Sequence, residues 1–381
     1  MHEPRREDLL SDMRHSSFLE INLSFLSENI EKIHQLAPKA KILPMVKADA
    51  YGNGIVAISQ HLVKECKLPT IGCASLGEAL HLFQQSPDLG CQIIVFSDTE
   101  LHDAELRSHY QNLPMTPVLH QPADVEAVLN DPRLNKLPII LKINTGMNRL
   151  GLSLTELEPL IPRLKNRGVK HVMTHFACSY YPLKDGDKTH RQMEEFRKAL
   201  KMLKDGGVSV EETSVSNSGA IEQKFGIDET WVRPGLMMYG PPSVEPFIWN
   251  GHQISRLCTR VLKTFLVKKG TPVGYGINVA PEDAHLAIIP LGYGDGLLTY
   301  ASGTKLKING LEARLFARVN MDMAFLSFDP SAAAKIKVGD AIEIWNHDNR
   351  VIADIAAQMK TIPYALMCAI SGRIPRIYKV K

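Results

Sequence analysis

The chain has 381 residues, of which 44% are hydrophobic and 22% are charged, and its formal net charge is +3. This length predicts two domains, each with its own hydrophobic core. Lys and Arg are scattered among Asp and Glu without a long run of one sign, so the charge pattern gives no indication of nucleic acid or an anionic membrane as a partner.

The opening segment MHEPRREDLLSDMRHSS is charged and lacks the apolar core of a signal peptide. No stretch of about eighteen apolar residues occurs that would predict a membrane span. The cysteines are dispersed and show no CxxC spacing of the kind that binds zinc or cycles between redox states. We therefore expect a soluble, cytoplasmic protein with reduced thiols and no metal site.

From residue 41 onward, short aliphatic runs alternate with longer segments of helical periodicity, such as SLTELEPLIPRLKNRG and HRQMEEFRKALKMLKDGG. This alternation predicts α/β units. The eight strands that we expect are 41–47, 69–75, 91–97, 115–121, 137–145, 170–177, 211–218 and 231–240. Eight such units predict a (β/α)8 barrel of the TIM type over residues 16–249.

The character of the sequence changes after Gly240, where PPSVEPFIWNGHQ is rich in proline. Short alternating strands such as AHLAIIPLGY, TKLKING and DAIEIWN follow, with one helical stretch, VIADIAAQMK. This pattern predicts a mainly β domain over residues 250–381. The early run SFLEINLSFL is compatible with a strand in either domain.

Polar residues close several of the predicted barrel strands, and the chemistry of such barrels lies at the C-terminal ends of the strands. The residues in question are Lys47, Lys142, Arg149, His175, Asn217, Ser218 and Arg233. Burial at the end of an apolar strand lowers the pKa of a lysine and favours its neutral amine, which is the form that attacks aldehydes. Lys47 is therefore a candidate for a covalent coenzyme linkage. The competing interpretation is that its stem extends along the barrel rim and leaves the ammonium in water.

The sequence around this lysine, MVKADAYGNG, resembles the coenzyme-binding signature of the alanine racemase family, which belongs to the fold-type III pyridoxal-phosphate enzymes. Further similar stretches occur in the family's order over nearly the whole chain. They are KINTGMNRLG, MTHFACS, SNSGAI, RPGLMMYG, VGYGI, GYGDG, RVNMDM and PYALMCAISGRIPRIY. The resemblance implies a pyridoxal 5'-phosphate-dependent isomerase that interconverts L-alanine and D-alanine.

The resemblance also implies catalytic roles. Lys47 would carry the coenzyme and act as one base, and Tyr275 would be the base on the opposite face of the substrate. His175, with Arg233 behind it, would favour ionisation of the tyrosine. Arg233 would also face the pyridine nitrogen and keep it unprotonated, which weakens the ring as an electron sink and limits side reactions such as transamination.

Other implied contacts are with the coenzyme and the substrate. The coenzyme would contact Lys47, Tyr51, Arg149, His175, Asn217, Ser218, Arg233, Gly235, Leu236 and Tyr364. The substrate would contact Arg149, Met321 and Asp322. Lys142 would be the lysine that is carbamylated in many relatives and that positions an arginine. The resemblance further implies a homodimer in which Tyr275 reaches the site of the partner subunit.

The chain departs from the family's pattern at a few positions. Asn144 stands where Asp is usual, which puts carbamylation of Lys142 in doubt. Asn53 stands where a histidine is common. Leu298 and Thr299 follow GYGDG where the family usually has Pro-Arg, which leaves the chemistry of the substrate entrance open.

Alternative functions remain open at this stage. His171 and His175 form an HxxxH pair, but on a strand they would be roughly 13 Å apart, too far to share a metal ion. A non-catalytic coenzyme-binding barrel lacks a β domain, and a decarboxylase of this fold usually has an acidic residue in place of Arg233. A broad-specificity or serine racemase is the nearest rival. The role in peptidoglycan supply or in alanine catabolism is open as well.

Overall fold

The computed structural model describes residues 16–380. Most of the opening segment in which no signal peptide is expected lies outside these residues. The chain divides into two compact units. The barrel unit comprises Leu26–Ala50 and Gly54–Gly251, and the second unit comprises the described residues up to Phe25, Tyr51–Asn53 and the chain from His252 onward.

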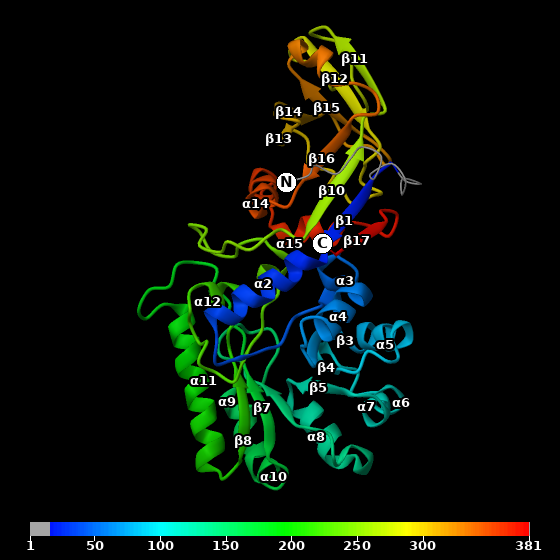
Figure 1. Ribbon diagram of the computed structural model, residues 1–381. Coiled ribbons are helices and arrows are strands. Elements are labelled where there is room, and N and C mark those ends of the chain that lie inside the picture. The colour runs from blue at the N-terminus through cyan, green and yellow to red at the C-terminus, as the bar shows by residue number, and fades with distance from the viewer. Residues whose placement is uncertain (1–15, 381) are drawn as a thin grey trace. The chain divides into compact units, whose positions relative to one another are not determined.

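Eight parallel strands form the sheet of the barrel unit, in the order β2-β9-β8-β7-β6-β5-β4-β3 (Figure 1). Their bounds are β2 Lys41–Ile42, β3 Thr70–Ser75, β4 Gln92–Asp98, β5 Met115–Leu119, β6 Ile140–Lys142, β7 Val169–Met173, β8 Val210–Ser214 and β9 Trp231–Val232. A parallel bridge between Met45 and Gly72 joins the two ends of this order. The predicted (β/α)8 barrel is therefore confirmed.

The helices of this unit surround the strands in Figure 1. They are α2 Leu23–Leu36, α3 Lys47–Tyr51, α4 Ile55–Lys64, α5 Leu76–Gln85, α6 Ala104–Arg107, α7 His109–Asn112, α8 Pro122–Asn130, η1 Pro132–Leu134, α9 Leu154–Leu157, η2 Glu158–Leu160, α10 Ile161–Lys165, α11 Lys188–Asp205, α12 Ser218–Glu222 and α13 Leu236–Tyr239. Local signals set several of their starts. The Asp187 side chain, for example, accepts a hydrogen bond from His190 N at the first turn of α11.

Several strands end earlier than their apolar runs predict. Pro44, which has no amide hydrogen, lies two residues after the end of β2, and only an isolated bridge at Met45 continues that strand. The runs 211–218 and 231–240 each turn into a short helix after the strand, because the Asn217 side chain caps α12 and Pro234 ends the extended backbone before α13. The polar residues expected on strand ends consequently lie on the segments that follow the strands.

The second unit contains two sheets. The four-stranded sheet has the order β16-β10-β1-β17, from Ala341–Trp345, Ser255–Arg260, Phe18–Asn22 and Arg376–Lys379. The five-stranded sheet has the order β11-β12-β15-β14-β13, from Lys263–Val267, Ala284–Ile289, Ala324–Phe328, Leu311–Phe316 and Lys305–Ile308. Helices α14 (Asn349–Gln358) and α15 (Pro363–Ala369) and the 3-10 turn η3 (Pro330–Ala334) complete it. The predicted mainly β domain is confirmed.

The division between the units differs from the predicted boundary at residue 249 in two places. The run SFLEINLSFL is half strand and half helix, and its strand β1 pairs with β10 and β17 of the second unit. Residues 16–25 therefore do not belong to the barrel unit, where we expected them. Tyr51–Asn53 also belong to the second unit, because Arg376 donates to the Gly52 carbonyl oxygen and Tyr378 Oη donates to the Asn53 carbonyl oxygen.

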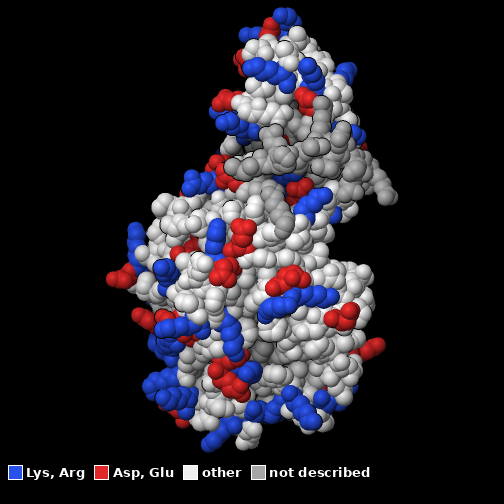
Figure 2. Space-filling model, viewed as in Figure 1, with Lys and Arg blue, Asp and Glu red and all other residues white. Residues whose placement is uncertain are grey.

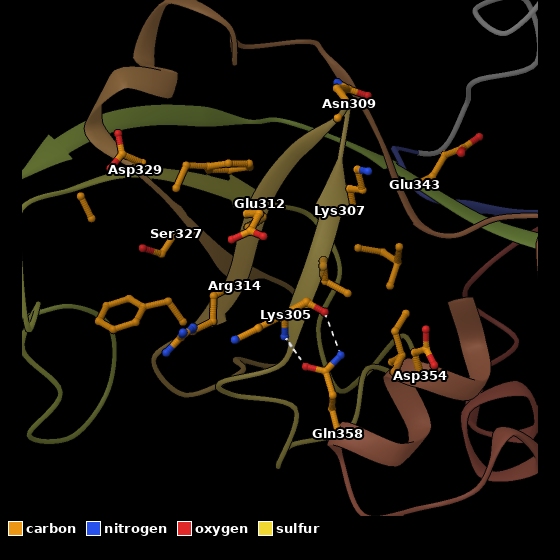
Figure 3. Close-up of a pocket in the computed structure, with 18 of the residues that line it drawn as sticks. Lys305, Lys307, Asn309, Glu312, Arg314, Ser327, Asp329, Glu343, Asp354 and Gln358 are labelled. Atoms are coloured by element: carbon orange, nitrogen blue, oxygen red, sulfur yellow. Dashed lines mark hydrogen bonds between the residues drawn. The ribbon is translucent and has the colours of Figure 1, made fainter. Parts of the chain in front are cut away.

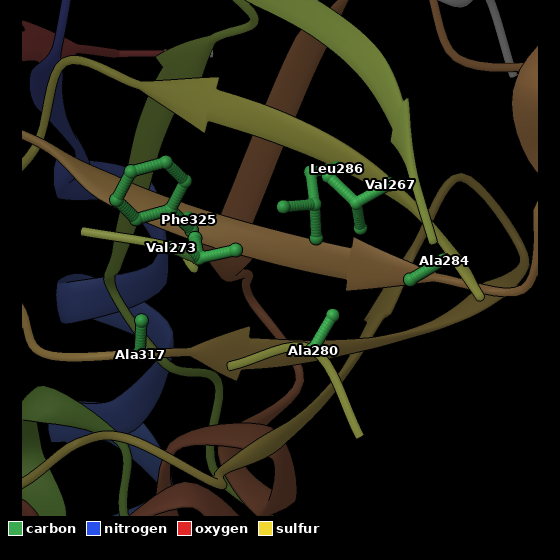
Figure 4. Packing of buried hydrophobic residues seen from close by; sticks show 7 residues of the cluster. All are labelled: Val267, Val273, Ala280, Ala284, Leu286, Ala317 and Phe325. Atoms are coloured by element: carbon green, nitrogen blue, oxygen red, sulfur yellow. The ribbon is translucent and has the colours of Figure 1, made fainter. Parts of the chain in front are cut away.

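A core of small and aliphatic residues supports the five-stranded sheet (Figure 4). Its buried members are Val267, Val273, Ala280, Ala284, Leu286, Ala317 and Phe325. Val273 and Ala280 belong to the loop between β11 and β12 rather than to a strand. Burial of these two side chains fixes both ends of the short segment that carries Tyr275.

Candidate active site

Lys47 begins a left-handed turn at the mouth of the barrel. The backbone of Ala48, Asp49 and Ala50 has φ near 53°, a conformation that costs non-glycine residues roughly 1–2 kcal/mol each. Glu78 supports the turn, because its carboxylate accepts hydrogen bonds from Ala48 N at 2.6 Å and Ala74 N at 2.7 Å. Lys47 is exposed rather than buried, so the desolvation argument for its neutral amine does not apply to the chain as described.

Three basic residues lie near one another inside the barrel end. Burial, together with the positive charges of Arg233, Arg149 and Lys47, lowers the pKa of Lys142 to about 8. Burial and the same arginines hold the pKa of His175 well below its usual range. Burial lowers the pKa of Arg233 to about 10. His175 is therefore a neutral imidazole near pH 7, and Arg233 remains a cation.

Hydrogen bonds fix the guanidinium of Arg233, whose residue is only 4% exposed. One terminal nitrogen donates to Ser214 Oγ at the end of β8, and the other donates to the Thr174 carbonyl oxygen. Thr174 Oγ1 in turn donates to the Ile143 carbonyl oxygen at 2.9 Å. The arginine thus connects the ends of three neighbouring strands.

Two short helices start side by side beyond β8 and β9. Asn217 caps α12, and its Oδ1 accepts hydrogen bonds from Ala220 N at 3.2 Å and Ser179 Oγ at 2.6 Å. Ser218 Oγ accepts from Gly235 N at 3.0 Å, which joins the start of α12 to the start of α13. Leu236, the first residue of α13, is fully buried. Amide groups at paired helix starts favour an anionic ligand.

Arg149 lies on the loop after β6 and is exposed. Asn144 organises this loop, since its Oδ1 accepts hydrogen bonds from Gly146 N at 3.1 Å and Asn148 N at 3.0 Å. The amide at position 144 therefore closes the turn between Lys142 and Arg149 without placing a carboxylate beside them.

Tyr275 lies in the second unit, at the tip of the loop held by the core of Figure 4. Val273 N donates to the Asn278 carbonyl oxygen, and Asn278 Nδ2 donates to the Tyr275 carbonyl oxygen at 2.7 Å. The flanking Gly274 and Gly276 have φ of 69° and 82°, which the tight turn requires. The tyrosine is 68% exposed, so the hydrogen-bonded loop holds its phenol at the surface of the second unit.

The remaining predicted residues of the second unit form two groups. Tyr51 and Tyr364 lie ring to ring at 5.6 Å, and burial with repulsion from Tyr364 raises the pKa of Tyr51, which keeps its phenol a hydrogen-bond donor. Asp322, beside the exposed Met321, pairs with Arg373 at 2.8 Å. Asn53 is buried, and its Nδ2 donates to the Tyr51 carbonyl oxygen.

The loop GYGDG, which precedes Leu298 and Thr299, packs against the loop that carries Met321. Gly294 N donates to the Met321 carbonyl oxygen at 2.9 Å, and a side chain at Gly292 would lie within 2.2 Å of the same oxygen. Thr299 is exposed and Leu298 is half-buried. The glycines therefore allow two backbones to approach, which explains the motif without a phosphate-binding role.

A cavity of about 1060 Å³ occurs elsewhere in the second unit (Figure 3). Lysines and an arginine of β13 and β14 line it together with carboxylates such as Glu312 and Asp354. Gln358 forms one wall and bonds to both backbone groups of Lys305. None of the predicted site residues lines this cavity. Its mixed charges define no ligand class, so we do not place the active site there.

The surface agrees with the scattered charge of the sequence. On the face shown in Figure 2, Lys and Arg are interspersed with Asp and Glu over the barrel unit. Among the described residues, no helix is both long enough and apolar enough to span a membrane.

The structure places the residues that the sequence singled out in several groups. In the barrel unit, one group of interacting charges comprises Lys47, Lys142, Arg149, His175 and Arg233, and a second group at the starts of α12 and α13 comprises Asn217, Ser218, Gly235 and Leu236. In the second unit, Tyr51 lies against Tyr364, Met321 adjoins Asp322, and Tyr275 lies on the loop between β11 and β12. Sequence reasoning missed Glu78, Ser214 and Arg373 as supports. The spacing of Glu78 from the Ser75 cap marks it as a helix residue, and nothing in the sequence indicates that it also holds the turn after Lys47.

An anionic coenzyme suits the barrel end. After burial, neighbouring cations contribute most to the lowered pKa values of Lys142 and His175. The site therefore has an excess of positive charge. A phosphate at the starts of α12 and α13 would offset part of this excess. Arg233 is fixed and cationic, as a partner for an unprotonated pyridine nitrogen must be.

Known proteins resemble this chain along both units. The family model of the alanine racemase N-terminal domain matches residues 21–242, and that of the alanine racemase C-terminal domain matches residues 254–378. Alanine racemases of Alcanivorax borkumensis and Nitrosococcus oceani are 32% and 30% identical to it over 371 residues, which cover 94% and 93% of this chain and 98% and 97% of those proteins.

Solved structures of alanine racemases have the same fold as this chain. The biosynthetic alanine racemase of Pseudomonas aeruginosa superposes with a TM-score of 0.84 at 25% identity, over 96% of this chain and 99% of that one. The alanine racemase of Bartonella henselae, solved with covalently bound pyridoxal phosphate, has a TM-score of 0.83 at 23% identity, over 96% of this chain and 100% of that one.

The parallel barrel with cations at its mouth and the mainly β unit are each matched by a racemase family model, so the protein is an isomerase of the pyridoxal-phosphate-dependent class. The chain belongs to the alanine racemase family.

Proposed function

We propose that this protein interconverts L-alanine and D-alanine by a two-base mechanism with pyridoxal 5'-phosphate as its coenzyme. The observation that carries the proposal is the arrangement around Arg233, a buried and fully oriented cation at the barrel mouth with Lys142 and His175 beside it. When bound, the coenzyme withdraws electrons from the substrate and makes its Cα–H bond acidic.

The barrel unit supplies the coenzyme site. In the absence of substrate Lys47 would hold the coenzyme covalently, and the coenzyme phosphate would lie at the starts of α12 and α13, beside Ser218, Gly235 and Leu236. Tyr51 and Tyr364 add phenol donors, and the direction of the pKa shift of Tyr51 supports a protonated phenol. Arg149 contacts the coenzyme or the substrate carboxylate.

Two residues of the chain move protons. Lys47 Nζ exchanges a proton with Cα on one face of the substrate, and Tyr275 Oη does so on the other. Neutral His175 offers the tyrosine a hydrogen-bond partner, while Arg233 provides the fixed positive charge that favours a phenolate. Met321 and the neighbouring Asp322, whose own carboxylate pairs with Arg373, would line the site of the substrate carboxylate.

We propose that Tyr275 acts in the site of a partner subunit, so that the protein is a homodimer with shared active sites. The tyrosine is 68% exposed, and Ile277, two residues further along the same loop, is 98% exposed. A rigid loop that presents large apolar side chains to solvent is typical of a surface that another chain covers.

Lys142 is the proposed site of a carbamate. Its lowered pKa increases the fraction of neutral amine that can add CO2, and the product would be an anion among cations. Asn144 contributes no opposing charge at the turn, since its side chain is bound to backbone amides. We therefore favour carbamylation despite the departure from the family's usual Asp.

The cellular role that we propose is supply of D-alanine for peptidoglycan or catabolism of alanine, in the cytoplasm. All six cysteines are free, which agrees with a reducing compartment. A broad-specificity or serine racemase of the same fold is the alternative function, because the side chains that set pocket width come from both chains of the proposed dimer.

Borohydride reduction followed by peptide mapping tests the coenzyme site. We expect one pyridoxyl group per chain on Lys47 and none on Lys142. The reaction itself is tested by incubation with each L-amino acid in deuterated water, with measurement of Cα exchange and of the chiral product. Modification at another lysine, or racemisation of serine in preference to alanine, would contradict the proposal.

A further inference from the structure

His171 lies in the middle of β7 and is only 2% exposed. Its Nε2 is 2.8 Å from Ser214 Oγ, the hydroxyl that accepts a hydrogen bond from Arg233. Strands β7, β8 and β9 are neighbours, with Met173 opposite Ser214 and Ser214 opposite Trp231. The side chains of His171 on β7, Ser214 on β8 and Arg233 directly after β9 therefore form a continuous row that ends at the arginine of the candidate site.

The direction of these hydrogen bonds follows from the available donors. Arg233 can only donate, so Ser214 Oγ is the acceptor in that contact. In the described part of the chain, the other hydrogen-bond partner of Ser214 Oγ is His171 Nε2, and the hydroxyl proton is bound within this pair only if Nε2 is unprotonated and accepts it. We therefore assign the proton of the imidazole to Nδ1.

The surroundings of His171 keep it in this neutral form. Burial and the charge of Arg233 lower its pKa to about 3, and Lys170 acts in the same direction against the carboxylate of Glu212. The ring also stacks on Trp231 with centroids 6.5 Å apart and planes 20° apart, which fixes its orientation. A neutral acceptor in a fixed orientation is what the hydroxyl of Ser214 requires.

We propose that His171 is a positioning residue that acts through Ser214 on Arg233, so that the row His171–Ser214–Arg233 sets the orientation of the guanidinium. The inference rests on the proposed function in one respect, namely that Arg233 faces the coenzyme ring. Without its acceptor, the hydroxyl of Ser214 turns toward another group and presents its proton, rather than its lone pair, near the guanidinium. One of the two terminal nitrogens of Arg233 then loses its hydrogen-bond acceptor.

The first test observes Arg233 directly in the full chain without coenzyme. With 15N-labelled arginine, restricted rotation of the guanidinium gives separate terminal-nitrogen signals, assigned to Arg233 by their loss in Arg233→Lys. We expect the signals to merge in Ser214→Ala and in His171→Phe, which keeps a ring on Trp231 but offers no acceptor. His171→Gln, whose amide oxygen replaces the acceptor, should retain them. His285→Phe removes another buried imidazole, in the second unit, and serves as control.

The second test measures the reaction of the holoenzyme. Ser214→Ala and His171→Phe should each lower kcat for racemisation by on the order of tenfold and raise pyruvate formed per turnover, with KM nearly unchanged. The double variant should lose on the order of tenfold as well, not a hundredfold, because both changes break one row. His171→Gln should recover most of the rate.

The outcomes separate the two proposals. Unchanged arginine signals and unchanged pyruvate formation in His171→Phe would overturn the positioning role, as would a double variant whose losses multiply. If the wild-type chain fails to bind coenzyme at Lys47 or to racemise alanine, the proposed function is wrong, but the coenzyme-free measurement still decides the role of His171. Should His171→Phe not fold, Ser214→Ala, which removes a single buried hydroxyl, provides the same comparison.

Discussion

The hydroxyl oxygen of Ser218 accepts hydrogen bonds from two backbone amides of the following strand-helix unit, Gly235 N at 3.0 Å and Met237 N at 3.3 Å. One side chain thus holds the start of α12 against the start of α13. Both helix starts belong to the proposed phosphate site, so their separation depends on this serine.

Replacement of Ser218 by Ala should weaken coenzyme binding. It removes the link that sets the separation of the two helix starts, at a cost of roughly 1–3 kcal/mol, and should raise the dissociation constant of pyridoxal phosphate about tenfold. Titration of the coenzyme-free protein by fluorescence measures this constant. Ser153→Ala, which removes a helix cap of α9 outside the site, is the control and should leave the constant unchanged. Equal affinities in both variants would show that the helix starts do not bind the phosphate.

Replacement of Tyr275 by Phe should lower racemisation by about 10²–10⁴-fold, since one general base is lost. The absorbance of the bound coenzyme should stay the same. In deuterated water, Cα exchange should persist for one enantiomer without formation of the other. Tyr181→Phe removes an exposed phenol of the barrel unit and should behave as wild type. If Tyr275→Phe interconverts both enantiomers at the native rate, another residue is the second base.

Two inactive variants should complement each other if the sites are shared. Mixing Lys47→Ala with Tyr275→Phe under conditions of subunit exchange gives mixed dimers in which one site carries both lesions and the other carries neither. Random pairing makes about half the dimers mixed, so roughly a quarter of native activity should return. Mass spectrometry confirms the exchange. No recovery after proven exchange would place both residues in one chain's site.

Carbamylation of Lys142 should be visible near pH 8, where much of its amine is neutral. With 13C-bicarbonate, we expect one carbamate resonance in the 13C spectrum that disappears in Lys142→Met. Lys170→Met should retain it, because the carboxylate of Glu211 raises the pKa of Lys170 and keeps that amine charged. A spectrum without a carbamate signal at saturating bicarbonate would leave Lys142 as an ordinary amine.

The free energy of unfolding should depend on His171 in acid. The folded pKa of about 3 lies below the unfolded value near 6.5, so the unfolded chain binds more protons between these limits and stability falls as the pH drops. The slope due to His171 approaches about 1.4 kcal/mol per pH unit. Denaturant unfolding at pH 7 and pH 5 should therefore show that the free energy of unfolding falls less between these pH values in His171→Gln than in wild type. His175 and Glu222 remain in both proteins and cancel in the comparison.

Much of the fold follows from sequence periodicity, because each barrel strand is a buried apolar run and each helix has its own start signal. Periodicity does not indicate where each strand ends. Pro44 and Pro234 shorten two runs by backbone geometry, and the Asn217 side chain turns a third into a helix. Strand β1 was ambiguous for a similar reason, since its partners β10 and β17 lie far away in the sequence.

The candidate site shows the same limit. Motif resemblance singles out Lys47 and Arg233 but says nothing of what holds them. The Glu78 carboxylate that supports the turn after Lys47 and the Ser214 hydroxyl that holds Arg233 come from other strand-helix units. In the sequence, His171 is noticeable only as part of an HxxxH pair, and its contact with Ser214 depends on the register between two strands.

The pairing of the first and last strands has a consequence for biosynthesis. β1 lies between β10 and β17 and runs parallel to the latter, with Leu19 opposite Arg376. β1 precedes the barrel unit in the chain and β17 follows it, whereas the barrel unit is complete in the nascent chain once residue 251 has emerged. The barrel can therefore form during translation, while β1 must wait, first for β10 and then for β17, before its sheet closes. Because β17 covers one edge of β1, removal of β17 would expose that edge to aggregation while leaving the barrel intact.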